Sequence, residues 1–176
     1  PKAVADIDGD GDIDIVTAQA WYENTNGSGT SWQQHKNIDL GVAHQYGLAV
    51  KTWVEDMDGD GDIDVVQAEA DNDDSRVAWF ENDGSGNWTR HMIKNSGDVQ
   101  DFHSLIVMDF DNDGDFDVFS GGGPLSSKTK KTYIWENTAG ANGTPISSKW
   151  TEHVLTSGTP CHEAMGGDVD GDGDID

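Results

Sequence analysis

The sequence is poor in cysteine, in basic residues and in long apolar runs. It has one cysteine among 176 residues, so no intrachain disulfide can form. Lys and Arg number 10 against 34 Asp and Glu, which gives a formal net charge of −24. Such a surface repels nucleic-acid phosphates, so DNA and RNA are excluded as partners. No apolar run approaches the roughly 20 residues that a membrane-spanning helix needs, so no membrane span is expected.

The acidic residues are concentrated in four short segments with one pattern. Each segment reads Asp-x-Asp-x-Asp-Gly-Asp-x-Asp, and together they hold 20 of the 34 acidic residues. The segments begin at Asp6, Asp56, Asp109 and Asp168, which are 50, 53 and 59 residues apart. A motif that recurs at this spacing indicates an internal structural repeat.

Two further markers follow each of the first three acidic segments. The first marker ends in Glu-Asn, and the second has the form Trp-x-x-His. The Glu-Asn markers are Trp21–Asn24, Trp79–Asn82 and Ile134–Asn137. The Trp-x-x-His markers are Trp32–His35, Trp88–His91 and Trp150–His153. We interpret the histidines and tryptophans of these markers as residues that pack within each repeat.

The segments between the markers have the composition of short β-strands. They are rich in Val, Ile, Trp, Tyr and Thr and are separated by Gly, Asn, Asp and Ser clusters. In the second repeat, strands are predicted at Leu48–Glu55, at Ile63–Ala68 and at the two markers. Four antiparallel strands in about 50 residues are typical of a β-propeller blade, so the predicted fold is all-β.

The repeat boundaries predict three blades and part of a fourth. We place blade 1 at 1–40, blade 2 at 41–97, blade 3 at 98–158, and the first strand and acidic loop of a further blade at 159–176. In the first repeat Trp21 lies only 7 positions after Asp14, whereas in the second Trp79 lies 15 positions after Asp64. Either the first hairpin is stunted, or residues are absent from this repeat.

These motifs resemble the FG-GAP/VCBS repeats of calcium-binding β-propellers, and the acidic loops are similar to those of integrin α subunits. The resemblance implies a disc of about seven blades. It also implies an extracellular or secreted protein, or one at the cell surface, of the adhesive or polysaccharide-acting kind. With three blades and part of a fourth, the ring needs further blades, either from the same longer chain or from self-association.

The acidic loops are predicted calcium sites. Calcium takes six to eight oxygen ligands, and aspartates at alternate positions of a tight loop can point several carboxylates inward. In the first loop, side-chain ligands are assigned to Asp6, Asp8, Asp10 and Asp14, with the Asp12 carbonyl as a further ligand. The glycine at the sixth position allows the turn, and Asn112 at the fourth position of the third loop tolerates a left-handed backbone.

The same scheme extends to the other three loops. Magnesium and zinc fit less well, because magnesium prefers octahedral geometry with bound waters and zinc is poorly served by oxygen alone. The further predicted ligands are Asp56, Asp58, Asp60, Asp62, Asp64, Asp109, Asp111, Asp113, Asp115, Asp117, Asp168, Asp170, Asp172, Asp174 and Asp176.

A second candidate site lies where the first strand of each blade begins. His103 and His162 each stand six residues before an acidic loop. The first strand of a propeller blade lines the central channel, so these side chains are expected to converge near the axis. His44 and Tyr46 precede the second loop and complete the candidate ligand-binding set. Satisfied polar residues at strand starts are the alternative interpretation.

Three functions fit this sequence. The first is an extracellular, calcium-stabilised propeller that binds glycan or protein and has no catalytic residues in this segment. The second is part of a propeller-type polysaccharide lyase or sugar dehydratase, in which a base removes the proton next to a uronate carboxylate. The third is a purely structural array of blades or a filament.

Overall fold

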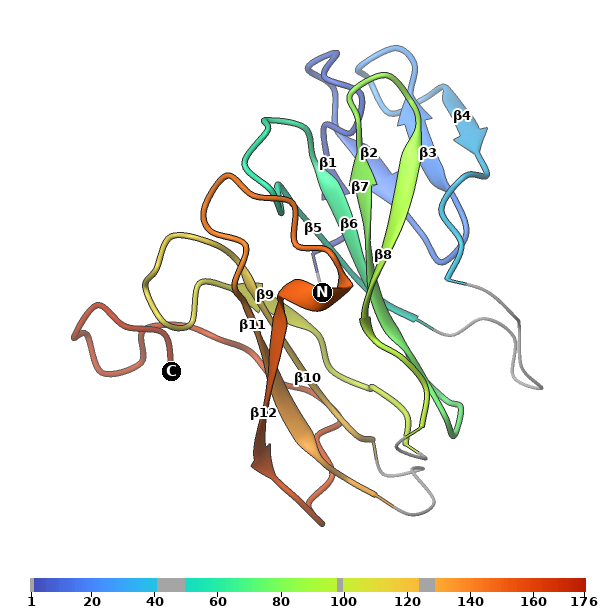
Figure 1. Ribbon diagram of the computed structural model, residues 1–176. Helices are drawn as coiled ribbons and strands as arrows, with labels where there is room; N and C mark the ends of the chain where they lie inside the picture. The colour runs from blue at the N-terminus through green and yellow to red at the C-terminus, as the bar shows by residue number, and fades with distance from the viewer. Residues whose placement is uncertain (1, 41–49, 98–99, 124–128) are drawn as a thin grey trace.

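The computed structural model describes residues 2–40, 50–97, 100–123 and 129–176, and within these ranges the protein is almost entirely β (Figure 1). Three separate sheets each contain four antiparallel strands in sequential order. The first comprises β1 (Val4–Ala5), β2 (Asp14–Val16), β3 (Trp21–Asn24) and β4 (Trp32–His35). The second comprises β5 (Val50–Glu55), β6 (Asp64–Glu69), β7 (Val77–Asn82) and β8 (Trp88–Lys94). The third comprises β9 (Ile106–Met108), β10 (Asp117–Gly121), β11 (Thr132–Asn137) and β12 (Trp150–Thr156), with a 3-10 turn at Ser147–Lys149.

The predicted fold class is therefore confirmed: three four-stranded blades are present, and each begins with the strand that enters an acidic loop. The markers pair across strands three and four in one register in all three blades. The Glu-Asn asparagine always faces the first residue of the Trp-x-x-His marker, in the pairs Asn24↔Trp32, Asn82↔Trp88 and Asn137↔Trp150.

The middle blade is buried on both faces because its side chains alternate between two neighbours. Val65 of β6 packs in one apolar core with Ile7 and Val16 of the first blade. The next residue, Val66, packs in a second core with Phe102 and Trp135 of the third blade. Every residue of β6 is buried for this reason. The blades stack face to face, as they do in a propeller.

The first blade has a short hairpin, which is one of the two alternatives that the short spacing left open. Its strands β1 and β2 have 2 and 3 residues, against 6 and 6 for β5 and β6 of the second blade. Its outward face leaves Val4, Ile13 and Ile15 exposed. The short hairpin therefore covers less of its own apolar surface than the equivalent hairpin of blade 2 does.

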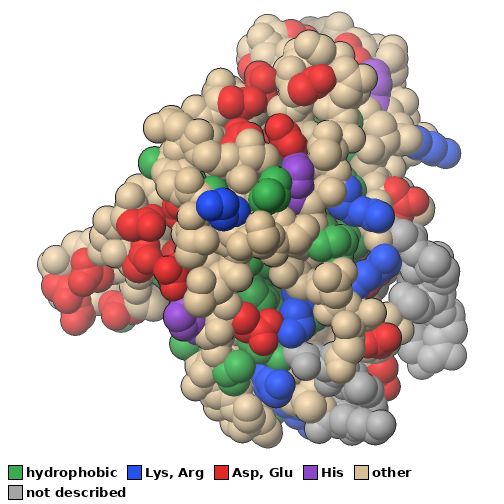
Figure 2. Space-filling model, viewed as in Figure 1, with side chains coloured by type: hydrophobic (Ala, Val, Ile, Leu, Met, Phe, Trp, Pro, Cys, Tyr) green, Lys and Arg blue, Asp and Glu red, His purple; other side chains and the backbone are tan. Residues whose placement is uncertain are grey.

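The first strands of the blades lie beside one another, and the acidic loops follow along one edge of the molecule (Figure 1). Lys2, just before β1, forms a parallel bridge with Trp53 of β5, and β5 in turn contacts β9. In Figure 2 acidic side chains gather along the same edge. An acidic loop therefore occurs at the same position in each successive blade, between its first and second strands.

Residues 157–176 contain the fourth acidic loop but no strand. The loop is closed by backbone hydrogen bonds between Gly167 and Asp176. The predicted first strand of a further blade is not formed there, since no neighbouring strand among the described residues offers it a hydrogen-bonding edge. The loop is folded although no strand follows it among the described residues, and it contacts the third loop through Asn112 and Asp174.

Candidate metal centres

Each acidic loop is folded by hydrogen bonds from its own backbone to its own carboxylates. In the second loop, Asp56 accepts hydrogen bonds from the N–H groups of Gly59, Asp60 and Gly61 at 2.8–3.2 Å. Asp60 accepts one from Asp62 at 2.9 Å. Such local turns explain why aspartate recurs at alternate positions.

The backbone of the loops turns where glycine and asparagine were expected to allow it. Gly11 and Gly61, at the sixth position, have φ of 94° and 99°. Asn112, which replaces the glycine of the fourth position, has φ of 60°, as predicted for a left-handed asparagine. A side chain with a branched β-carbon would be strained at any of these positions.

Three carboxylates converge in every loop. In each group, one oxygen from each residue lies within 4.8 Å of the others. In three loops the first, third and ninth positions converge, whereas in the first loop the first, third and fifth do. The groups are Asp6, Asp8 and Asp10; Asp56, Asp58 and Asp64; Asp109, Asp111 and Asp117; and Asp168, Asp170 and Asp176. A convergent set of oxygens without nitrogen or sulfur suits a hard cation such as calcium.

The ninth aspartate has a second role that sequence reasoning missed. Asp64 is fully buried, and its two oxygens accept hydrogen bonds from the N–H groups of Met57 and Asn82, both at 2.8 Å. Asp14 and Asp117 make the equivalent pairs of bonds in the other blades. This carboxylate therefore joins the start of the loop to the Glu-Asn marker of the third strand.

The seventh aspartate points out of the loop towards the glycine-rich turn after the third strand. Asp115 accepts a hydrogen bond from the Gly140 N–H at 3.0 Å. A β-carbon on Gly27 would come within 2.5 Å of an Asp12 oxygen, and one on Gly84 would collide with Asp62. Glycine is required in these turns because the aspartate occupies the space of a side chain. The backbone carbonyl of this residue remains the predicted ligand.

Burial and mutual repulsion disfavour the charged form of several loop carboxylates. Burial raises the pKa of Asp64 to about 8, and the nearby charges of Asp58 and Asp60 add to the effect. Burial, together with the charge of Asp113, raises the pKa of Asp115 to about 7. Burial also raises the pKa of Asp117, to about 6. A bound cation would remove this penalty, since it stabilises the ionised carboxylates.

The loops also contact the neighbouring blade. The Asn82 side chain donates a hydrogen bond to the Ile7 carbonyl in the first loop at 2.9 Å. Thr144 donates to Asp58 of the second loop at 3.3 Å. Asn112 donates to Asp174 at 2.8 Å, which links the third loop to the fourth. An ion that orders a loop would therefore also order the junction between two blades.

His35 and His91 of the Trp-x-x-His markers pack within their blades, whereas the His153 side chain is 50% exposed. Each one pairs with the glutamate of the adjacent Glu-Asn marker, at 2.7, 2.7 and 2.6 Å in the three blades. The rings of His35 and His91 also stack on Trp21 and Trp79, with centroids 4.3 and 4.7 Å apart. Among the marker tryptophans, Trp32 is the most exposed, at 40%.

The structure brings together two members of the candidate ligand-binding set. The rings of His103 and His162 stack with centroids 4.3 Å apart, although 59 positions separate them in the chain. Asp71 and Asp101, which sequence reasoning did not select, lie beside His103. His44 and Tyr46 lie outside the described residues.

The described tyrosines and arginines are engaged elsewhere. Arg76 forms a bidentate pair with buried Glu69, and Arg90 donates to backbone carbonyls of Asp39 and Leu40 at 3.4 Å. Tyr133 is fully buried.

The fold and the loops together define the class of protein: an array of antiparallel blades, each of which carries an aspartate-rich loop. Residues 56–120 match the family described as the FG-GAP-like repeat. The matched segment runs from the second acidic loop through the third, so this part of the chain is similar to an FG-GAP-like repeat. No curated protein matches the chain.

Proposed function

We propose that this chain is an extracellular, calcium-stabilised blade module that binds a glycan or protein and has no catalytic role of its own. The observation that carries the proposal is the convergence of three carboxylates in each of four loops that recur along one edge of the blade array. Calcium at millimolar concentration, as found outside cells, suits weak sites of this kind. No helix among the described residues is long and apolar enough to cross a membrane.

Several features support a binding role over a catalytic one. The outward faces of the first and third blades expose apolar side chains, which include Val4, Ile15 and Leu155. Exposed apolar groups of this kind suit contact with further blades, from a longer chain or from a second copy. The exposed ring of Trp32 adds a surface on which a sugar can stack.

Binding and catalysis are distinguished by incubating the calcium-loaded protein with immobilised neutral and anionic polysaccharides. We expect calcium-dependent retention on at least one glycan or protein surface, with no rise in the ultraviolet absorbance of unsaturated uronates. Trp32→Ala should weaken retention if sugar stacking contributes, whereas Trp88→Ala, on the equivalent strand, serves as the matched control. Formation of an unsaturated product would overturn the non-catalytic proposal in favour of a lyase.

A further inference from the structure

One histidine faces two carboxylates at the junction of the second and third blades. The Nε2 atom of His103 lies 2.9 Å from an Asp71 oxygen and 3.9 Å from an Asp101 oxygen. Asp71 follows β6 of the second blade, whereas Asp101 and His103 precede β9 of the third. One ligand atom from each residue lies within 4.8 Å of the others. Unlike the acidic loops, this cluster contains a nitrogen donor.

The surrounding chain fits closely around the three side chains. Asp101 is 1% exposed, and its other oxygen accepts a hydrogen bond from the Gly123 N–H at 2.9 Å. A β-carbon on Gly123 would come within 2.8 Å of both Asp101 and His103. The absence of a side chain at Gly123 therefore makes room for this cluster. Asp71 adopts φ of 55°, a strained conformation that often marks functional positions.

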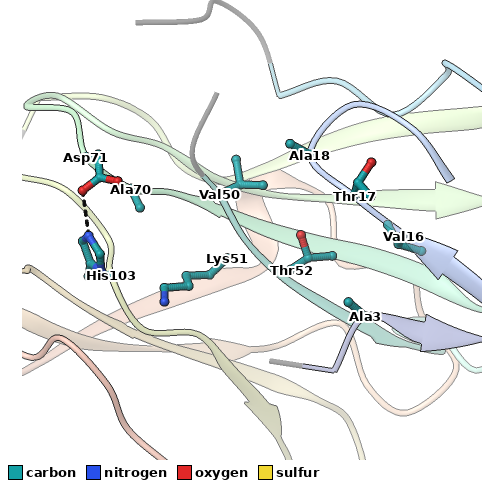
Figure 3. A pocket seen from close by; sticks show the side chains of 10 residues that line it. All are labelled: Ala3, Val16, Thr17, Ala18, Val50, Lys51, Thr52, Ala70, Asp71 and His103. Carbon is teal, nitrogen blue, oxygen red and sulfur yellow. Dashed lines mark hydrogen bonds and ion pairs between the residues drawn. The ribbon is translucent and has the colours of Figure 1, made fainter. Parts of the chain in front are cut away.

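The cluster opens onto a cavity between the inner ends of the first two blades. The cavity has a volume of about 480 Å³, and Asp71 and His103 form part of its wall (Figure 3). Lys51 brings an ammonium group into the same cavity, and the small residues Ala3 and Ala18 line the side contributed by the first blade. A ligand in the cavity would therefore meet the cluster from its open side.

We propose that Asp71, Asp101 and His103 bind a divalent transition metal ion of the zinc class. Zinc bonds of about 2.0–2.2 Å in tetrahedral geometry place neighbouring ligand atoms about 3.3–3.5 Å apart. The two contacts of Nε2, at 2.9 and 3.9 Å, lie on either side of that spacing. Small side-chain rotations would equalise them. One nitrogen and two carboxylate oxygens are a donor set that suits zinc better than calcium.

The fourth position of such an ion would face the cavity and would be open to water or to a small anionic ligand. Three protein ligands with one open position are typical of metal sites that act on or bind a ligand, whereas structural zinc sites are closed by four. The Lys51 ammonium group, which lies 4.0 Å from a Glu163 oxygen, lines the same cavity and favours an anion such as a carboxylate there. The ion would also tie the second blade to the third.

The test is a cobalt titration of the protein in excess calcium, which keeps the acidic loops saturated. Tetrahedral cobalt with a nitrogen ligand absorbs strongly in the visible range, whereas octahedral cobalt bound by oxygen absorbs weakly. We expect one strongly absorbing cobalt ion per chain, which zinc displaces. Asp71→Asn and His103→Gln should each weaken cobalt binding at this site at least about tenfold.

His153→Gln is the matched control. His153 also pairs with a carboxylate, that of Glu136 at 2.6 Å, but it does not belong to a group of three convergent ligands among the described residues. Its cobalt spectrum should equal that of the unmodified protein. Asp71→Asn guards against a folding defect in His103→Gln, since asparagine tolerates the left-handed backbone at this position. Absence of the strong absorption, or its persistence in both cluster variants, would show that the cluster is only a hydrogen-bonded junction between blades. Either result leaves the calcium proposal untouched, because loop binding is measured separately by melting in calcium and EGTA.

Discussion

Removal of calcium with EGTA is expected to lower the melting temperature of the protein by roughly 10–30 °C. A ligand that binds only the folded state stabilises it by RT ln(1 + [L]/Kd), about 1.4–2.7 kcal/mol per site when calcium is in 10- to 100-fold excess over Kd. Three loops that lie between paired strands would together contribute about 4–8 kcal/mol, which is comparable with the whole stability of an ordinary domain.

Electrostatic repulsion in the metal-free loops should also destabilise the protein when calcium is removed. Twenty aspartates in four loops repel one another, and burial raises the pKa of Asp64, Asp115 and Asp117 above the ordinary value of an aspartate. Melting is followed by circular dichroism in 10 mM calcium, in EGTA, and in magnesium at the same ionic strength. Magnesium should restore little of the loss. Identical curves in calcium and in EGTA would rule out a stabilising role for the loops.

Asp64→Asn is expected to destabilise the calcium-loaded protein by about 2–4 kcal/mol. Asp64 is fully buried, accepts two backbone hydrogen bonds and converges with Asp56 and Asp58. Asparagine keeps the shape but turns one acceptor into a donor that faces a backbone N–H. It also removes one charge from the oxygen cluster, so the calcium concentration at the midpoint of binding should rise about tenfold or more.

Asp62→Asn is the matched control, because it removes the same charge from the same loop at a side chain that points away from the cluster. Asp62→Asn should lower the free energy of unfolding by less than about 1 kcal/mol. Chemical denaturation in 10 mM calcium gives both values, and a calcium titration followed by tryptophan fluorescence gives the midpoints. If the two variants behaved alike, loop stability would depend only on net charge. The two backbone hydrogen bonds that Asp64 accepts would then contribute nothing measurable.

Much of this fold follows from local sequence. The period of about 50 residues, the strand composition and the turn glycines predict the number and order of the strands, because these features depend on neighbours in the chain. The left-handed backbone of Asn112 was also predictable for this reason, and the short spacing before Trp21 gave a stunted hairpin as one of two alternatives.

What the sequence did not predict depends on contacts between distant segments. The Asp64 carboxylate was assigned to a metal alone, because its bond with the Asn82 N–H exists only once β6 and β7 pair. Asp71 was not selected at all, since it meets His103 only when the second and third blades stack. Strand pairing and blade stacking thus give these carboxylates hydrogen-bond and ion-pair partners that the sequence of a single loop does not contain.

The central claim is that the aspartate loops bind calcium, and a count of bound ions by equilibrium dialysis tests it most directly. The protein is dialysed against 10 mM calcium, and the ions retained per chain are measured beside a sample in excess EGTA. The convergent carboxylates predict about three to four calcium ions per chain, with partial loss of one ion in Asp64→Asn. Fewer than about one ion per chain under these conditions would contradict the account.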